Sequence, residues 1–165
     1  MKRYHFILFL LVICTLPSFA QNEFLDGVYL SSDEELIKEI NQQKELIDKK
    51  MSAYHKVEKV RDSLGYRNAY FDGKELKLVI VFYRENNLDK TKHWYFQKGK
   101  LVYGESTISA IGYGSQKDEK LYLDNEHLFW WTIGGIPVDR NSVMFKKSAN
   151  ELGYYSLQLI MENKE

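Results

Sequence analysis

The sequence predicts an α+β protein in which an N-terminal amphipathic helix packs on an antiparallel sheet of about six strands, followed by a C-terminal helix. Three observations support this fold class: helical spacing of apolar residues before residue 53, alternating spacing after Gly65, and a short unit that occurs three times in the alternating part. Each copy of the unit starts with a tyrosine and ends with a leucine six residues later. The copies are 70–76, 95–101 and 122–128.

The first twenty residues are typical of a signal peptide. Lys2 and Arg3 precede an apolar run over 6–16, and the segment 18–20 has the small residues of a cleavage site. The run is too short for a permanent membrane span, which needs about 20 apolar residues. We therefore expect cleavage near Ala20, delivery to the periplasm or outside the cell, and no stable membrane insertion.

The single cysteine, Cys14, lies in this leader and would be removed with it. An alternative is that Cys14 anchors a lipoprotein, but Ile13 is bulkier than the small residue that such processing requires before the cysteine. The mature chain would then have no disulfide to stabilise it.

Charge and length limit the function classes. Loss of Lys2 and Arg3 turns the balance of 23 basic and 23 acidic residues into a net charge of −2. A nearly neutral surface does not attract nucleic acid or anionic lipid over long range. The length fits a flexible lead-in over 21–32 and a single domain over 33–165, which is large enough to bury a core.

The N-terminal helix is expected over about 33–52. Serine and aspartate at 31–33 are capping residues, and acidic residues follow in the first turn. Apolar residues then recur at helical spacing, at Leu36, Ile40, Ile47, Met51 and Tyr54. The segment 53–64 fits either a continuation of this helix or an edge strand.

The alternating part predicts three hairpins, over 66–84, 92–108 and 119–133. Their turns contain Gly73, Lys98-Gly99 and Asn125, which tolerate the positive φ of tight turns. A polar turn over 85–90 and a longer loop over 111–119, rich in glycine and charge, are expected to connect them. A further turn is expected at 134–135, and Pro137 excludes a central strand position beyond it.

A C-terminal helix is expected over 142–161. It aligns Phe145, Ala149, Leu152, Tyr155 and Leu159 on one face. Gly153 in its interior costs about 1 kcal/mol. The segment 154–161 also alternates as a strand would, but the helix is favoured.

Strict alternation would give the sheet two different faces. One face is purely apolar near its centre, and we expect it to form the core under the 33–52 helix. It comprises Ala69, Phe71, Leu76, Leu78, Ile80, Phe82, Trp94, Phe96, Leu101, Tyr103, Leu121, Leu123, Leu128 and Trp130.

The opposite face combines aromatic and polar side chains. It comprises Tyr70, Tyr95 and Tyr122, flanked by Val79, Val81, Tyr83, Val102, Phe129 and Trp131, with Asp72, Lys77, His93, Gln97, Lys120 and His127 among them. It is either an ordinary sheet face, left exposed or covered by the C-terminal helix, or a binding platform. The candidate binding residues are Tyr70, Tyr95, Tyr122, Trp131, Phe129, His93 and His127.

The sequence does not contain a pattern that identifies a catalyst. The histidines lack the local spacing of zinc ligands, so no metal or cofactor is predicted. His93 and His127, with Asp124, form the one candidate for a metal or acid–base pair. Carboxylates of a hydrolase need only be close in space, and the candidates are Glu85, Glu105, Asp118 and Glu119.

The repeated unit carries a resemblance. The stretches 70–77, 94–101 and 122–130 resemble hairpins of the Y-F-x-x-G-K-L kind in a family of small exported proteins of unknown function from Gram-negative bacteria. The likeness covers about 33–160. A weaker likeness is to β-hairpin repeat proteins of the MORN type. The third unit departs from the pattern at Glu126-His127, which predicts a wider turn. The resemblance implies export and the hairpin fold and supplies no activity.

These observations together predict an exported, non-catalytic binding or interaction module. Its partner would be an unidentified envelope protein, peptide or glycan. The alternatives are a hydrolase of envelope polymers that uses the loop carboxylates, and a protein inhibitor or assembly factor that presents a sheet edge or the 111–119 loop.

Overall fold

The computed structural model describes the backbone of residues 19–61, 65–86, 88–110 and 113–162, and the side chains from Ser32 onward except 59–61, 110 and 113–117. The expected leader therefore lies almost entirely outside the described residues. The chain divides into two compact units, Met1–Leu36 and Ile37–Glu165. The sheet, the cavities and the sites described below all belong to the second unit.

Helix α2 (Phe19–Lys50) begins earlier than expected. Residues 21–32, predicted to be a flexible lead-in, are helical, and the serines and aspartate at 31–33 do not cap a helix start. The expected end near residue 52 is close, because the short 3-10 helix η1 (Met51–Ala53) follows directly. The ambiguous segment after it is a strand, β1 (His55–Arg61).

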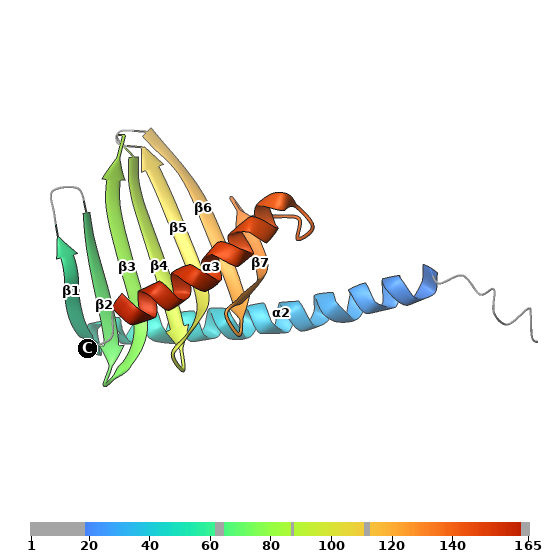
Figure 1. The fold of residues 1–165 in the computed structure, drawn as a ribbon, viewed down its shortest axis with the longest axis horizontal. Helices are drawn as coiled ribbons and strands as arrows, with labels where there is room; N and C mark the ends of the chain where they lie inside the picture. Colours follow the sequence, from blue (N-terminus) through green and yellow to red (C-terminus); the bar gives the residue numbers. More distant parts are fainter. Residues whose placement is uncertain (1–18, 62–64, 87, 111–112, 163–165) are drawn as a thin grey trace, which may run out of the picture. The chain divides into compact units, whose positions relative to one another are not determined.

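The sheet has eight antiparallel strands in chain order, β1 to β8 (Figure 1). After β1 come β2 (Gly65–Asp72), β3 (Glu75–Glu85), β4 (Leu88–Gln97), β5 (Lys100–Ala110), β6 (Tyr113–Asp124), β7 (His127–Ile133) and β8 (Ile136–Pro137). The expected α+β class is confirmed, but the expected six strands are too few. The two additional strands, β1 and β8, are the edges of the sheet. Pro137 lies in β8, and proline is tolerated there because an edge strand pairs on one side only and can lack an N–H donor on the other.

The three predicted hairpins are β2–β3, β4–β5 and β6–β7, each closed by a two-residue turn. Gly73 has a φ of +60°, Lys98 and Gly99 have +50° and +75°, and Asn125 and Glu126 have +47° and +68°. The third turn is therefore as tight as the others, not wider, although it places a glutamate in the left-handed region. The predicted 111–119 loop is wrong as well, since β6 already begins at Tyr113.

All three hairpins contain a β-bulge at the same position of the repeated unit. In the first, Phe71 pairs with Leu76 while Tyr70 pairs with Leu78, which leaves Lys77 as the extra residue. The other two hairpins repeat this register, with Val102 and Phe129 as the extra residues after Leu101 and Leu128. One additional residue reverses the face to which every later side chain of that strand points.

Because of the bulges, the predicted faces are wrong for the second strand of each hairpin, whose side chains beyond the bulge point to the opposite faces. Val79 pairs with Trp94, on the face of the leucines, whereas Leu78 pairs with Tyr95 on the tyrosine face. Similarly, Trp131 pairs with Leu121, whereas Trp130 and Tyr103 join the row of Tyr122. The predicted assignments for the first strands, including Tyr70, Tyr95 and Tyr122 opposite Phe71, Phe96 and Leu123, are consistent with this register.

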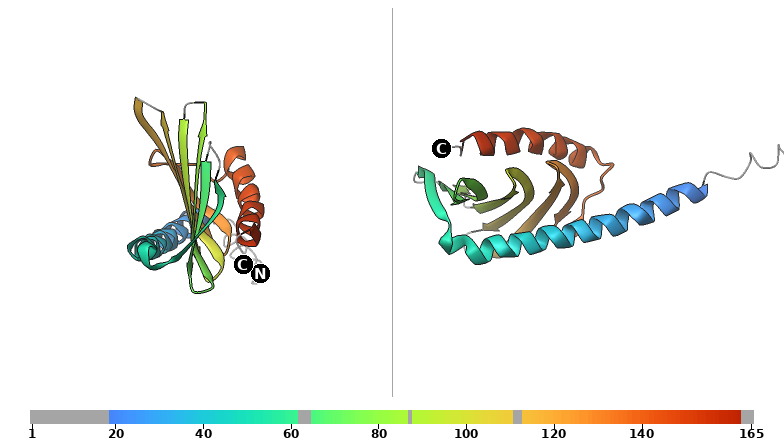
Figure 2. Two further views of the ribbon diagram at one scale, coloured as in Figure 1. Left: turned by 90° about the vertical axis from the view of Figure 1, so that its left-hand side faces the viewer. Right: turned by 90° about the horizontal axis from the view of Figure 1, so that it is seen from below.

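Two helices cover the two faces of the sheet, and the assignment of the helices is the reverse of the prediction. Figure 2 shows the sheet between α3 (Val143–Glu162) on one side and the second half of α2 on the other. The apolar core cluster includes Phe145, Leu152 and Leu159 of α3, so α3 covers the leucine face. The predicted C-terminal helix over 142–161 is confirmed.

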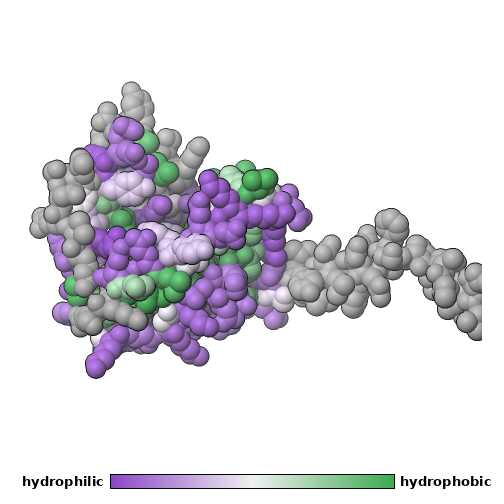
Figure 3. Space-filling model, viewed as in Figure 1, coloured by the Kyte–Doolittle hydropathy of each residue, from purple (hydrophilic) through white to green (hydrophobic). Residues whose placement is uncertain are grey.

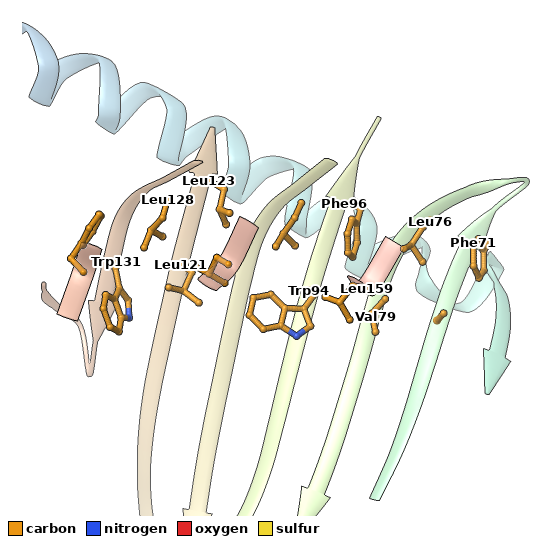
Figure 4. Packing of buried hydrophobic residues seen from close by; sticks show 14 residues of the cluster. Phe71, Leu76, Val79, Trp94, Phe96, Leu121, Leu123, Leu128, Trp131 and Leu159 are labelled. Atoms are coloured by element: carbon orange, nitrogen blue, oxygen red, sulfur yellow. The ribbon is translucent and has the colours of Figure 1, made fainter. Parts of the chain in front are cut away.

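The core under α3 runs across the hairpins as one row of large side chains (Figure 4). Its centre is the indole of Trp94, which lies on the backbone of Gly104 in the neighbouring strand. A Cβ atom on Gly104 would lie 2.4 Å from the indole carbon Cζ3. The absence of a side chain at this position is therefore a condition for the packing of Trp94.

We predict that Gly104→Ala destabilises the fold by about 1–3 kcal/mol, the usual range for overpacking, because the buried indole would have to move away from the sheet. Gly153→Ala is the matched control. Gly153 lies inside α3 and has open space at its Cβ position, so alanine there should raise the stability by up to about 1 kcal/mol. Urea unfolding measures both, and a neutral Gly104→Ala would contradict the role assigned to Gly104.

Candidate functional site

The tyrosine face is covered by α2 rather than open. The Tyr95 hydroxyl donates to Asp48 Oδ1 at 3.0 Å, and the Tyr122 hydroxyl donates to Asn41 Oδ1 at 3.2 Å. Tyr95 is 1% exposed and Tyr122 is 6% exposed. Of the two interpretations left open for this face, an accessible platform is therefore contradicted at Tyr95 and Tyr122, because these residues form the contact surface for a helix.

The aromatic row itself is real and longer than predicted. The ring of Tyr103 lies 5.5 Å from that of Tyr95 and 4.9 Å from that of Tyr122, and Phe129 follows at 6.5 Å from Tyr122. Tyr103 joins it only because of the bulge at Val102. Tilted aromatic neighbours of this kind stabilise a sheet beyond the area they bury.

The remaining predicted aromatic residues do not share one surface. Trp131 is 5% exposed and lies on the other side of the sheet, with its ring 6.3 Å from that of Phe145 in α3. Phe129 and Tyr70 are half-buried on the tyrosine side. Burial raises the pKa of the Tyr70 phenol.

His93 and His127 are not brought together. His93 lies in β4 and His127 in β7, and these strands are about 14 Å apart across the sheet. The β7 residue in the same row as His93 is Thr132, so His127 lies a further five residues away along β7. His127 pairs with Asp124 at an exposed hairpin end. Over the described residues, no group of three or more His, Cys, Asp or Glu side chains is placed to hold a metal ion.

His93 instead belongs to a polar cluster around Glu105, which we call the Glu105 cluster. The Tyr103 hydroxyl donates to Glu105 Oε2 at 3.0 Å, and His93 Nδ1 lies 3.3 Å from Oε1. Lys44 of α2 approaches the same oxygen at 3.7 Å and binds Asp48 at 2.7 Å. Lys44, Asp48, His93, Tyr95, Tyr103 and Glu105 thus connect α2 to two central strands.

The cluster shifts the pKa values of its members. Burial raises the pKa of Glu105, but the hydrogen bond from His93, the charge of Lys44 and the hydrogen bond from Tyr103 outweigh it, so the pKa is lowered overall. Burial, followed by the negative charge of Glu105, raises the pKa values of Tyr95 and Tyr103 well above their ordinary value. The carboxylate is therefore held ionised and the two phenols neutral.

The sequence pattern did not identify Lys44, Asp48 or Glu105 as members of one cluster. Lys44 and Asp48 read as ordinary polar positions on the helix, and only their i, i+4 spacing showed that they share a face. Both carboxylate oxygens of Glu105 contact groups of the protein: Oε2 accepts from Tyr103, and Oε1 lies near His93 and Lys44. We therefore interpret the cluster as a structural network of hydrogen bonds and ion pairs that holds α2 on the sheet.

The four candidate hydrolase carboxylates are distributed over both faces. Glu105 pairs with Lys120, whereas Glu119 pairs with Ser106, the next residue along β5, so the two carboxylates project from opposite sides of the sheet. They cannot flank one substrate bond. Glu85, the last residue of β3, binds Lys90 of β4 at 2.7 Å. The pair Glu105 and Glu119 therefore does not supply the two carboxylates of a hydrolase.

An open groove lies between α3 and the leucine face of the sheet, beyond the apolar core. We call it the α3 groove; its volume is about 410 Å³, within the range of small-molecule sites. Its sheet wall comprises Lys92, Trp94, Glu119 and Leu121. Its helix wall comprises Ser148, Glu151, Leu152, Tyr154, Tyr155 and Gln158. Figure 3, seen from the α3 side, shows hydrophobic and hydrophilic residues interleaved over this face of the molecule.

Trp94 is the notable residue of the groove. It is 4% exposed, and its indole Nε1 has no hydrogen-bond partner among the described residues. The Tyr155 ring lies 5.1 Å away. Burial raises the pKa of the Tyr155 phenol, and the charge of Arg67 and the proximity of the Trp94 N–H oppose this rise. The Trp94 N–H therefore lies near the Tyr155 phenol, although the two do not meet the geometry of a hydrogen bond. A buried donor without a partner costs about 1–3 kcal/mol, which makes it a candidate contact for a ligand.

A second cavity, of about 460 Å³, remains open on the tyrosine side at the β6–β7 end of the sheet. Asp118, Lys120, Tyr122, Trp130 and Thr132 line it. The Arg140 guanidinium lies 5.5 Å from the centre of the Trp130 ring and occupies part of this aromatic surface. This cavity is the part of the predicted aromatic face that α2 leaves accessible.

Comparison with known proteins does not identify the chain: no protein-family model, curated protein or solved structure matches it. The resemblance to exported hairpin proteins therefore stays a prediction. Among the helices that the structure describes, none has a stretch long and apolar enough to cross a membrane.

The buried phenols predict how stability depends on alkaline pH. Folded-state pKa values raised above the unfolded value of about 10 contribute stability that is complete below pH 10 and lost as pH rises above it. Above pH 10, each of the two tyrosines should make the free energy of unfolding fall by about a further 1.4 kcal/mol per pH unit. Unfolding free energies from pH 8 to 11 should therefore fall less steeply in Tyr95→Phe than in the native protein.

Tyr154→Phe provides the control for this experiment, since Tyr154 is 80% exposed and its phenol contributes no buried hydroxyl. Its pH slope should match that of the native protein. Equal slopes for all three proteins would contradict the burial of an un-ionised Tyr95 in the folded state.

Proposed function

We propose that the protein is an exported, non-catalytic binding module that holds a small ligand in the α3 groove. One observation carries the proposal: Trp94, whose buried indole N–H has no hydrogen-bond partner among the described residues, lies in the wall of the groove. Tight burial of most of a ligand between an apolar floor and a few polar groups is the usual construction of such sites.

The walls of the groove support this use. Leu121, Leu152 and the aromatic Tyr155 supply apolar contact, and they are held in place by the same core that fixes Trp94. The polar side chains at the rim are half-buried or exposed, so they are accessible without unfolding α3. By contrast, the polar groups of the Glu105 cluster are already engaged with one another, which leaves the α3 groove as the better candidate.

Export is part of the proposal and rests on the composition of residues 1–20. Expression of the full chain in a Gram-negative host should yield a mature protein whose N-terminal residue is Gln21, as read by mass spectrometry of periplasmic and secreted fractions. Replacement of Lys2 and Arg3 by glutamate should retain the precursor in the cytoplasm. Recovery of an uncleaved native chain from the cytoplasm would contradict export.

Binding can be followed at the three indole N–H signals of Trp94, Trp130 and Trp131 in ¹⁵N–¹H spectra. A defined set of aromatic amines, carboxylic acids, dipeptides and oligosaccharides is added in turn. Ligands of the α3 groove should shift the Trp94 signal, because Trp94 lies in the groove wall and a bound ligand changes the surroundings of its indole. Trp131 is the internal control: its N–H is also buried without a partner, but it does not line the groove.

A steric variant separates the groove from other surfaces. Ser148→Phe places a ring in the groove and should abolish binding, whereas Lys147→Phe, at an exposed neighbouring position of α3, should leave it intact. The proposal fails if none of the compounds moves the Trp94 signal. It also fails if binding shifts only Trp130, which would favour the second cavity.

A further inference from the structure

The α3 groove contains side chains of opposite charge. Lys92 and Trp94 are two residues apart on β4 and point to the same face, with their Cα atoms about 7 Å apart along the strand. Two carboxylates also line the groove, Glu119 on β6 and Glu151 on α3. The groove is therefore electrically polarised from β4 toward β6.

The sheet register fixes the width of this arrangement. Lys92 pairs with Ser106, and Ser106 pairs with Glu119, so the lysine and the glutamate are two strand spacings apart, or about 10 Å between Cα atoms. The residue between them is small, which leaves room above the central strand. In the neighbouring row of paired residues, Gly104 lies between Trp94 and Leu121 and likewise leaves room above β5.

These groups keep capacity for a ligand. The Ser106 hydroxyl donates to Glu119 Oε2 at 2.8 Å, but a carboxylate accepts several hydrogen bonds. Glu151 lies 3.8 Å from Lys147 in an exposed i, i+4 pair, which contributes little. Within the described part of the chain, the Lys92 ammonium makes no ion pair with a carboxylate.

We infer, on the basis of the proposed function, that the ligand of the α3 groove is a small zwitterion with an apolar side chain: a free amino acid or a short peptide with free ends. Its carboxylate is placed at Lys92, and its amine at Glu119 and Glu151. The apolar side chain packs on Leu121 and Tyr155. A dianion would meet the two glutamates, and a dication would meet Lys92, so each leaves one wall of the groove unfavourable.

The test compares leucine and Leu-Leu with their N-acetylated and C-amidated forms, by calorimetry and by the Trp94 indole signal. We expect the free forms to bind, and each blocked form to bind at least about ten-fold more weakly, because one charge-assisted contact is lost. Whether leucine or Leu-Leu binds more tightly distinguishes the amino acid from the peptide.

Two variants assign the ends. Lys92→Met should remove the preference for a free carboxylate but keep the preference for a free amine, and Glu119→Gln should do the reverse. Lys74→Met and Glu45→Gln are matched controls at exposed positions outside the groove and should keep both preferences. Circular dichroism before titration establishes that each variant is folded.

The possible failures are distinct. If blocked and free forms bind the groove equally, or if neither binds while other compounds shift the Trp94 signal, the zwitterion is wrong and the binding groove stands. If no compound of any kind shifts that signal, the proposed function itself fails. Loss of both preferences in Lys74→Met or Glu45→Gln would also overturn the assignment of the two ends.

Discussion

The β-bulge after the leucine of each repeated unit is the constraint on which the rest of the structure depends. Without it, Leu78 and Trp130 would lie on the leucine face, and Val79 and Trp131 would lie on the tyrosine face. With it, Leu78 lies beside the tyrosines and Val79 beside Trp94, and both are buried. A sheet with two apolar faces needs two covers, and the two helices supply them.

The repeat of the bulge explains why the two sides of the sheet have different tasks. On one side it aligns the tyrosines in a row whose hydroxyls reach the polar stripe of α2 at Asn41 and Asp48. On the other side it places Gly104 opposite Trp94, so that the indole can lie flat on the sheet. The first side closes into a hydrogen-bonded lock, whereas the second keeps a donor that the protein itself does not satisfy.

Much of the fold was accessible from the sequence, because hairpins and amphipathic helices are local patterns. The positions of β2–β3, β4–β5, β6–β7 and α3 follow from alternation, turn residues and helical spacing. The faces of the second strands did not follow, because alternation is counted from a turn and a bulge breaks the count. A signal was present: Leu78-Val79 and Trp130-Trp131 are adjacent large apolar residues, which a sheet with one apolar face does not require.

The candidate site was less accessible for a different physical reason. Trp94 was expected as a core residue, and it is one; its second property, a buried N–H without an acceptor, depends on where α3 crosses the sheet and cannot be read from spacing. Lys92 and Glu119 are separated by more than twenty residues and meet only through the register of three strands. Trp94 and Trp131 both carry the stability cost of a buried N–H without a partner among the described residues, and of the two only Trp94 lies in the wall of the α3 groove.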